Sequence, residues 1–176
     1  MKLQELLEGI EVLECRAEPC MDVTGVSFDS RAVKQGELFV AVTGFAADGH
    51  KFIPAAVKNG AAAVLCERAP SGNIPYVLVK SARTALAQAA ANWFGHPADS
   101  MTMIGVTGTN GKTTVTYLLK TVLEQTLGAK VGLIGTIQNM IGDEILPTER
   151  TTPESFELQK LFAEMRDAGC THVVKI

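Results

Sequence analysis

The sequence predicts an α/β protein in two parts: a small α/β N-terminal domain over residues 1–97, and an incomplete parallel βαβ domain over residues 98–176. Three observations lead to this fold class. Before residue 100, short apolar strand segments alternate with segments of helical periodicity. The segment Gly95–Ser100 is polar and interrupted by Gly and Pro, as linkers between domains often are. From Met101 the order becomes strand, glycine-rich loop, helix and strand, which is the order of a βαβ unit.

The N-terminal domain is expected to contain several short strands and two helices. Apolar or alternating segments predict its strands at Asp22–Phe28, Glu37–Val42, Ala62–Cys66 and Tyr76–Val79. Apolar residues at helical spacing predict a helix over His50–Asn59, which Gly60 ends, and Asp48 before it suits a turn and helix cap. Ser81 is expected to cap a second helix that runs to about Phe94.

The second domain is expected to begin with a strand from Met101 and a helix from Lys112 that Gly128 ends. The apolar residues Val115, Leu118, Leu119, Val122 and Leu123 are expected on one face of that helix. After it, the pattern predicts a strand at Lys130–Gly135, a hairpin of Ile137–Ile141 and Glu144–Leu146, a helix over Ser155–Ala168 and a strand at His172–Ile176.

These elements amount to about half of a doubly wound sheet. Parallel sheets need both faces covered, and a last strand ending at Ile176 would be an unprotected edge. We therefore expect a piece of a larger protein, whose missing C-terminal part completes the sheet. The alternative is a complete small protein whose sheet is finished by a partner chain.

Composition excludes several classes of protein. Apolar residues make up 47% of the chain, which is enough for a packed core, and the formal net charge of −3 leaves no basic stripe for nucleic acid. No apolar run has the length of a signal peptide or a membrane span, so no membrane partner is expected. Four cysteines show no zinc-binding spacing, and Cys66 and Cys170 are expected to be buried free thiols. A soluble cytoplasmic protein is expected.

The motif with the most specific chemistry is Gly-Thr-Asn-Gly-Lys-Thr-Thr, between a strand and a helix start. Such a loop can direct backbone N–H groups at phosphate oxygens, while the lysine neutralises phosphate charge and the first threonine hydroxyl binds Mg²⁺. The strict phosphate-loop pattern would need glycine where this chain has Val106. The alternative is a glycine-rich turn with a solvated Lys112, but the helix dipole disfavours lysine at that position unless an anion binds. The predicted ATP-binding residues are Gly108, Thr109, Asn110, Gly111, Lys112, Thr113 and Thr114, with Lys112 and Thr113 in catalytic roles and Thr113 as the Mg²⁺ ligand.

This variant loop resembles that of the Mur ligases and the folylpolyglutamate synthetases, which activate a carboxylate with ATP and join it to an amine. The block Asp29–Ile53 resembles the uridine-nucleotide domain of the two Mur ligases that add the third residue and the final dipeptide, a domain that folate-type enzymes lack. Arg150–Glu154 resembles a Thr-Thr-Pro segment of the third-residue ligase. The resemblance covers nearly the whole chain and implies a uridine-nucleotide-binding N-terminal domain before a P-loop-type central domain.

Matching positions imply a set of substrate contacts. Ser30 would contact the UDP moiety beside Phe28, the loop of Phe45, Ala46 and Ala47 would line the uridine pocket, and Thr151 and Thr152 would hold the muramoyl peptide. Arg150 stands where some relatives have Asn, which leaves the first contact of that trio open. Each position also has a structural interpretation: Ser30 as a turn former, Thr151–Pro153 as a helix cap, and His50, His172 and Lys175 in structural roles.

The resemblance implies a ligase that adds a diamino acid, meso-diaminopimelate or L-lysine, to UDP-MurNAc-L-Ala-D-Glu through an acyl phosphate, with ATP and Mg²⁺. In the family, the strand that begins Thr-His-Val-Val continues into residues for a second Mg²⁺ and for substrate, and here it stops at Ile176. The chain is therefore expected to hold the nucleotide-binding half and to be inactive alone. Two alternatives are a truncated, non-catalytic UDP-sugar or ATP-binding module, and the related dipeptide-adding ligase.

Overall fold

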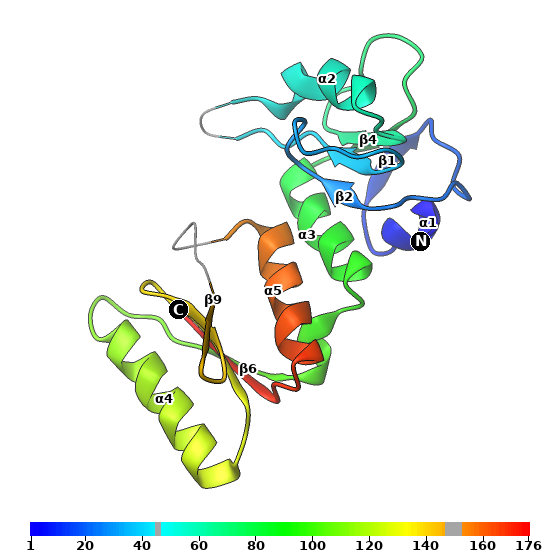
Figure 1. The fold of residues 1–176 in the computed structure, drawn as a ribbon. Helices are drawn as coiled ribbons and strands as arrows, with labels where there is room; N and C mark the ends of the chain where they lie inside the picture. Colours follow the sequence, from blue (N-terminus) through cyan, green and yellow to red (C-terminus); the bar gives the residue numbers. More distant parts are fainter. Residues whose placement is uncertain (45–46, 147–152) are drawn as a thin grey trace. The chain divides into compact units, whose positions relative to one another are not determined.

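The computed structural model describes residues 1–44, 47–146 and 153–176, and the chain divides into two compact units, Met1–Trp93 and Phe94–Ile176. Each unit contains a five-stranded sheet with parallel and antiparallel pairs, together with helices (Figure 1). The α/β class predicted from the sequence is confirmed.

The sheet of the first unit has the order β1-β5-β4-β3-β2. The pairs from β5 to β2 are parallel, whereas β1 joins the edge of β5 antiparallel. The strands are β1 (Val12–Cys15), β2 (Val26–Ser27), β3 (Leu38–Val40), β4 (Ala63–Cys66) and β5 (Tyr76–Val79). Strand β1 was not predicted, and the strand predicted at Asp22–Phe28 is shortened to β2, because Val23, Thr24 and Gly25 before it belong to no strand, although Val23 is buried.

The helices of this unit are α1 (Leu3–Leu6), η1 (Gly49–Phe52), α2 (Ile53–Lys58) and α3 (Ala82–Trp93). The single helix predicted over His50–Asn59 is therefore wrong in detail: a 3₁₀ turn capped by Asp48 precedes α2, and Pro54 lies in the first turn of α2. Ser81 caps α3 as predicted, since its hydroxyl accepts the Thr84 N–H at 3.3 Å. One core cluster packs α2 on one face of the sheet, and its buried members are Val33, Phe39, Ala41, Ile53, Ala56, Val64 and Cys66.

The sheet of the second unit has the order β6-β10-β7-β8-β9. Its strands are β6 (Thr102–Gly105), β7 (Val131–Ile134), β8 (Asn139–Ile141), β9 (Glu144–Leu146) and β10 (His172–Lys175). The last strand, β10, inserts between β6 and β7, parallel to both. The prediction that this strand forms an unprotected edge is therefore wrong, because a βαβ crossover can return a later strand between two earlier ones.

The remaining elements of this unit are η2 (Pro97–Ser100), α4 (Lys112–Leu127) and α5 (Ser155–Asp167). Helices α4 and α5 cover opposite faces of the sheet, since Val174 packs in the cluster that contains Leu119 and Leu123, whereas its neighbour Val173 packs with Phe162. Figure 1 shows the sheet with a helix on either side.

The apolar face predicted for α4 is divided in the structure. Leu119 and Leu123 pack against the sheet, while Val115, Leu118 and Val122 are 43%, 59% and 52% exposed. The sequence pattern placed the packed and the exposed residues on one face because residues three and four apart lie near one another on a helix surface.

Across residues 1–44, 47–146 and 153–176, no helix is both long enough and apolar enough to cross a membrane.

Candidate functional site

The glycine-rich loop lies where the parallel strands of the second unit end. Register pairs Gly105 of β6 with Lys175 of β10, and Lys175 with Ile134 of β7. The Val106 N–H then donates to the Lys175 carbonyl at 2.8 Å, which anchors the start of the loop to the central strand. Ligands of parallel α/β sheets bind outside the carboxyl ends of the strands, so the loop occupies the expected edge.

The backbone of this loop depends on two glycines. Gly108 has φ of 147° and Gly111, the N-cap of α4, has φ of 77°, values that side-chain-bearing residues rarely adopt. In the part of the chain that the structure describes, no backbone N–H from Thr107 to Thr114 donates to another backbone group, and the segment from Thr107 to Gly111 is exposed. These N–H groups at the start of a helix are therefore free to donate to an anion.

Lys112 provides the positive charge of the loop. Its Nζ folds back over the loop and donates to the Gly108 carbonyl at 2.7 Å. The side chain therefore already lies beside the backbone that would surround a phosphate group. Thr113 follows it in the first turn, and its carbonyl accepts the hydroxyl of the fully buried Thr116 at 2.8 Å, which fixes this turn from the core side.

A metal ion at this loop would have few protein ligands. Among the described residues, no group of three or more His, Cys, Asp or Glu side chains is arranged to hold a metal. Thr113 offers one hydroxyl oxygen, so a Mg²⁺ ion would take its remaining ligands from nucleotide phosphates and water. That division is usual for Mg²⁺ in nucleotide sites. The loop thus fits a nucleotide that brings the metal with it.

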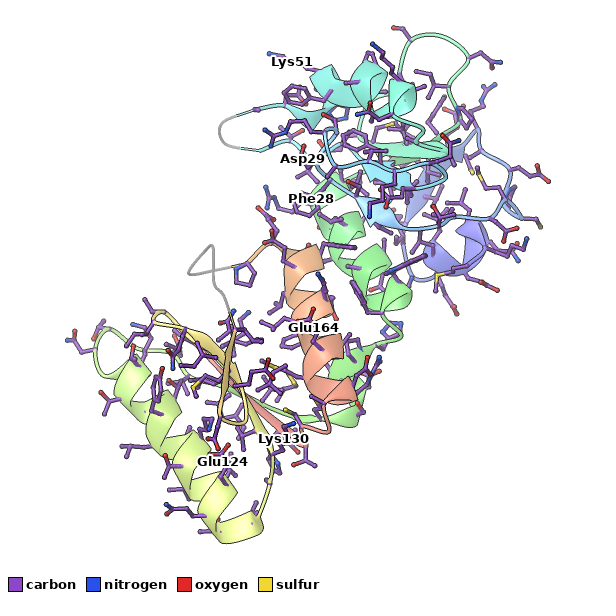
Figure 2. The ribbon with its side chains drawn as sticks, viewed as in Figure 1. Phe28, Asp29, Lys51, Glu124, Lys130 and Glu164 are labelled. Carbon is purple, nitrogen blue, oxygen red and sulfur yellow. The ribbon has the colours of Figure 1, made fainter. Side chains whose placement is uncertain are left out.

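The second predicted site begins at the end of β2, where Phe28 and Asp29 lead into a turn (Figure 2). Asp29 accepts the Arg31 N–H and Nε–H, both at 3.0 Å, and the Arg31 terminal nitrogen at 2.7 Å. These bonds lower the pKa of Asp29 from its usual range to about 2. The Ser27 hydroxyl also donates to the Asp29 carbonyl at 3.1 Å, so the side chains of Asp29 and Ser27 hold this turn. Ser30 is buried, and its carbonyl accepts the Asn59 side-chain amide at 2.8 Å, which ties the turn to the end of α2.

Ala47 is the described member of the predicted uridine loop. It lies in a hairpin in which Thr43 pairs antiparallel with Asp48, and the Gly44 N–H donates to the Ala47 carbonyl at 2.9 Å. Ala47 is exposed on this hairpin. Phe45 and Ala46, the other two predicted members, lie outside the described residues.

The predicted peptide-binding residues Thr151 and Thr152, with Arg150 before them, also lie outside the described residues. The helix that follows begins at Ser155 with Glu154 as its N-cap, and the Glu154 N–H donates to the Glu157 carboxylate at 2.9 Å. The structural interpretation of this segment as a cap with Pro153 in the first helical turn is therefore wrong, because Pro153 precedes the cap.

His50 has a structural position, as the sequence analysis favoured. Its Nδ1 lies 2.7 Å from Asp48 Oδ1, and its Nε2 accepts the Glu67 N–H at 3.0 Å. Arg68 also pairs with the Asp48 carboxylate, and the hydrogen bonds from His50 and Arg68 hold the pKa of Asp48 far below its usual range. The residues Glu67, Arg68 and Asn59 were not predicted to matter, because their roles depend on contacts 15 to 29 residues away in the chain.

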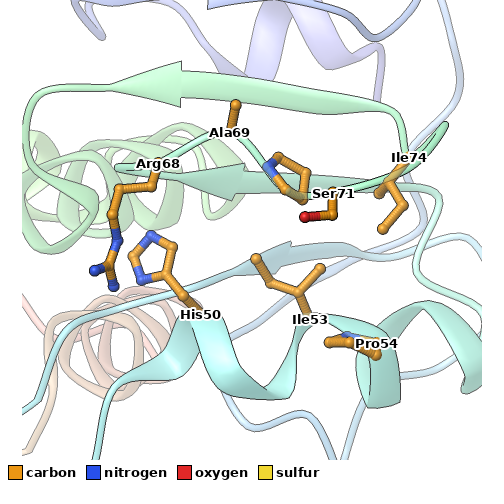
Figure 3. Close-up of a pocket in the computed structure, with 8 residues that line it drawn as sticks. His50, Ile53, Pro54, Arg68, Ala69, Ser71 and Ile74 are labelled. Carbon is orange, nitrogen blue, oxygen red and sulfur yellow. The ribbon is translucent and has the colours of Figure 1, made fainter.

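A cavity of about 380 Å³ opens beside His50. Figure 3 shows His50 and Arg68 next to each other at one end, with Ile53 and Pro54 of α2 facing the segment after β4. Its lining residues are His50, Ile53, Pro54, Arg68, Ala69, Pro70, Ser71 and Ile74. No residue predicted to bind substrate lines this cavity.

Each of the two units matches a domain of one known protein family. Residues 22–94 match the Mur ligase family catalytic domain, and residues 106–175 match the Mur ligase middle domain. The UDP-N-acetylmuramoyl-L-alanyl-D-glutamate–2,6-diaminopimelate ligase of Caldanaerobacter subterraneus subsp. tengcongensis is 49% identical over 176 residues, which is 99% of this chain and 36% of that protein. The enzyme of the same name from Clostridium tetani is 43% identical over 99% of this chain and 37% of its own length.

Solved structures agree with the sequence matches. A UDP-N-acetylmuramoyl-L-alanyl-D-glutamate–2,6-diaminopimelate ligase superposes with a TM-score of 0.80 and 27% identity, over 100% of this chain and 36% of that one. The MurF ligase of Thermotoga maritima in complex with ADP superposes with a TM-score of 0.58 and 29% identity, over 85% of this chain and 31% of that one. The chain thus spans about a third of the length of these relatives.

Proposed function

Because the chain belongs to the Mur ligase family over its N-terminal and middle parts, we propose that it is the nucleotide-binding portion of an ATP-dependent ligase of peptidoglycan precursor synthesis. The full enzyme would join a diamino acid to UDP-MurNAc-L-Ala-D-Glu. In this proposal the first unit binds the UDP-MurNAc substrate, and the second unit binds ATP.

The observation that carries the proposal is the phosphate loop in its fold context. Exposed, unpaired N–H groups, a helix start and Lys112 meet at the carboxyl edge of a parallel sheet. An ADP-bound relative with the same fold supports a nucleotide as the ligand. Identity of 49% and 43% to diaminopimelate-adding ligases favours the third-residue reaction over dipeptide addition.

In the proposed reaction, the substrate's D-Glu carboxylate attacks the γ-phosphorus of ATP, and ADP leaves. The amine of the diamino acid then attacks the resulting acyl phosphate, an amide bond forms, and phosphate leaves. The loop N–H groups and Lys112 would hold the triphosphate and neutralise the charge that develops on it. Mg²⁺, when bound with the nucleotide next to Thr113, would further offset the phosphate charge.

Within the described residues we find no candidate base that would deprotonate the attacking amine. We therefore propose that the chain binds both nucleotides and does not turn over alone. Its competitor from another functional class is a non-catalytic binding module, which would show the same binding but would never be part of a working enzyme.

Turnover separates these functions. Purified chain would be incubated with ATP, Mg²⁺, UDP-MurNAc-L-Ala-D-Glu and either meso-diaminopimelate or L-lysine, and phosphate and tripeptide product would be measured. We expect binding without product from this chain. Addition of the C-terminal remainder of a relative, expressed as a separate polypeptide, should produce tripeptide. Tripeptide from the chain alone would contradict its proposed inactivity. Preference for the tripeptide-linked substrate in a binding assay would favour the dipeptide-adding ligase instead.

A further inference from the structure

Several hydrogen bonds join the Thr43–Asp48 hairpin to the rest of the first unit. We propose that His50 and Glu67 are positioning residues that hold this hairpin, and with it Ala47, in the orientation that binds the uridine nucleotide. The inference rests on the proposed function, since it assigns a role to residues around the UDP-MurNAc site of that function. The described residues of the hairpin are Thr43, Gly44, Ala47 and Asp48.

The hairpin has little other support. Its own bonds are the Thr43–Asp48 bridge, the Gly44 N–H to Ala47 carbonyl bond, and a Gly49 N–H to Val42 carbonyl bond of 3.0 Å. None of its described residues belongs to the buried core, and Thr43 and Ala47 are exposed. A short two-stranded hairpin is marginal without packing, so contacts from outside it decide how it is oriented.

His50 supplies the first of these contacts. Its Nε2 accepts a hydrogen bond from the Glu67 backbone N–H. An N–H group can only donate, so Nε2 carries no proton. The ring proton is therefore on Nδ1, where it donates to Asp48 at 2.7 Å, and the Asp48 carboxylate also accepts the His50 N–H at 3.1 Å. The His50 side chain is 10% exposed. Both ring nitrogens are thus occupied within the unit, which makes His50 a positioning residue and not a ligand-binding one.

Glu67 supplies the second contact. One of its carboxylate oxygens accepts the Thr43 hydroxyl at 3.1 Å, and the other accepts the N–H of Ala82, the first residue of α3, at 2.8 Å. Thr43 and Asp48 are the two ends of the hairpin, so Glu67 holds one end through Thr43 and His50 holds the other through Asp48. A third contact is the ion pair between Arg68 and the Asp48 carboxylate. All three attachments therefore end at residues 67 and 68, immediately after β4, on the carboxyl edge of the parallel strands. That edge is where ligands of such sheets bind.

The same bonds could serve stability alone, and affinity measurements distinguish the two roles. The most selective variant is Thr43→Val, which removes one hydroxyl from an exposed residue and leaves its shape nearly unchanged. Thr43→Ser keeps the hydroxyl. Thr24→Val is the matched control, because Thr24 is exposed in the same unit and its hydroxyl makes a similar bond, 2.9 Å to the Gln35 carbonyl, away from the hairpin.

The dissociation constants for UDP-MurNAc-L-Ala-D-Glu and for ATP would be measured by calorimetry on the full chain, with melting temperatures for every variant. We expect Thr43→Val to weaken binding of the UDP ligand about fivefold and His50→Ala about 20-fold, as loss of one and two hydrogen bonds would. ATP affinity should stay within about twofold for both. Thr43→Ser should bind the UDP ligand like wild type. Thr24→Val should lower the melting temperature and leave the affinity for the UDP ligand unchanged.

Wild-type affinity for the UDP ligand in Thr43→Val and in any folded His50→Ala sample would overturn the inference while leaving the proposed function intact. Equal loss with Thr24→Val would also overturn it, since general destabilisation would then be the cause. Should His50→Ala fail to fold, the Thr43 pair decides the question alone. A wild-type chain that binds ATP but not the UDP ligand would instead reject the proposed function of the first unit, and this inference with it.

Discussion

Replacing Gly111 by alanine would perturb the phosphate loop at a single backbone position. Gly111 has φ of 77°, in the left-handed region. A Cβ built on it meets no atom within 4 Å, so the methyl group itself clashes with nothing. The cost is therefore the conformational one of placing an L-residue in that region, about 1–2 kcal/mol.

The loop can respond to Gly111→Ala in two ways. If it keeps its conformation, the variant loses about 1–2 kcal/mol of stability. If residue 111 rotates out of the left-handed region, the N–H groups before Lys112 are no longer aligned, and restoring them for ATP costs the same amount. We expect the second response to dominate because the loop is exposed, which corresponds to about a 5- to 30-fold weaker ATP affinity. Titration calorimetry with ATP and Mg²⁺ measures it directly.

Gly128 provides the matched control. It ends the same 16-residue helix with φ of 61°, and a Cβ there also meets nothing within 4 Å. The two glycines are separated by roughly 25 Å along the helix axis, from 1.5 Å per residue. Gly128→Ala should lower stability by a similar amount and leave ATP affinity unchanged. ATP affinity that is unchanged in Gly111→Ala, or equally reduced in Gly128→Ala, would refute the reasoning.

Three further predictions concern packing, thiols and charge. Leu133 is fully buried between the sheet and α4, so Leu133→Ala should lower the unfolding free energy by about 3 kcal/mol in urea titrations, and a loss below about 1 kcal/mol would contradict the packing described. The exposed Cys15 and Cys20 should react with a thiol reagent in the native protein, whereas the buried Cys66, whose pKa burial raises to about 11, and Cys170 should react only after unfolding; rapid labelling of all four would contradict this. Asp29 has its pKa lowered to about 2 by Arg31, so its ionised form stabilises the folded state above about pH 4, and this contribution is lost as pH falls from about 4 to 2. The stability difference between wild type and Asp29→Asn should be under about 1 kcal/mol because the pair is exposed, and it should vanish across that window; a difference that grows with acidity would have the wrong sign.

Most helices and strands could be predicted because their apolar periodicity is local. The helix Lys112–Leu127 shows this, since its length and its Gly128 cap follow from the sequence. Spacing did not, however, separate Leu119 and Leu123, which pack against the sheet, from the exposed residues predicted on the same face. The order of strands could not be predicted in the same way. The position of β10 between β6 and β7 depends on pairing with residues 70 and 41 positions earlier in the chain, so the last strand was expected at an edge and instead lies between two strands. Strand β1 was missed because its residues are largely exposed and lie at the edge of the sheet beside β5.

The two candidate sites differ in the same way, because one depends on a local pattern and the other on contacts distant in the sequence. The predicted phosphate loop, Gly108–Thr114, is one continuous segment, so its glycines and its lysine can be recognised in the sequence. In the structure it lies at the ends of the parallel strands. The surroundings of Ala47 depend on Glu67 and Ala82, which no local pattern connects to the hairpin. Local spacing was therefore enough to propose residues that would touch a ligand, whereas the residues that hold them through bonds distant in the sequence could not be proposed from it.

The central claim is that one chain carries two separate nucleotide sites, one in each unit. Calorimetric titration of the intact chain with UDP-MurNAc-L-Ala-D-Glu, then with ATP and Mg²⁺, followed by the reverse order, tests it most directly. We expect one site for each ligand, with ATP binding weakened by Gly111→Ala and binding of the UDP ligand unaffected by it. Competition between the two ligands for a single site, or no binding of either, would contradict the account.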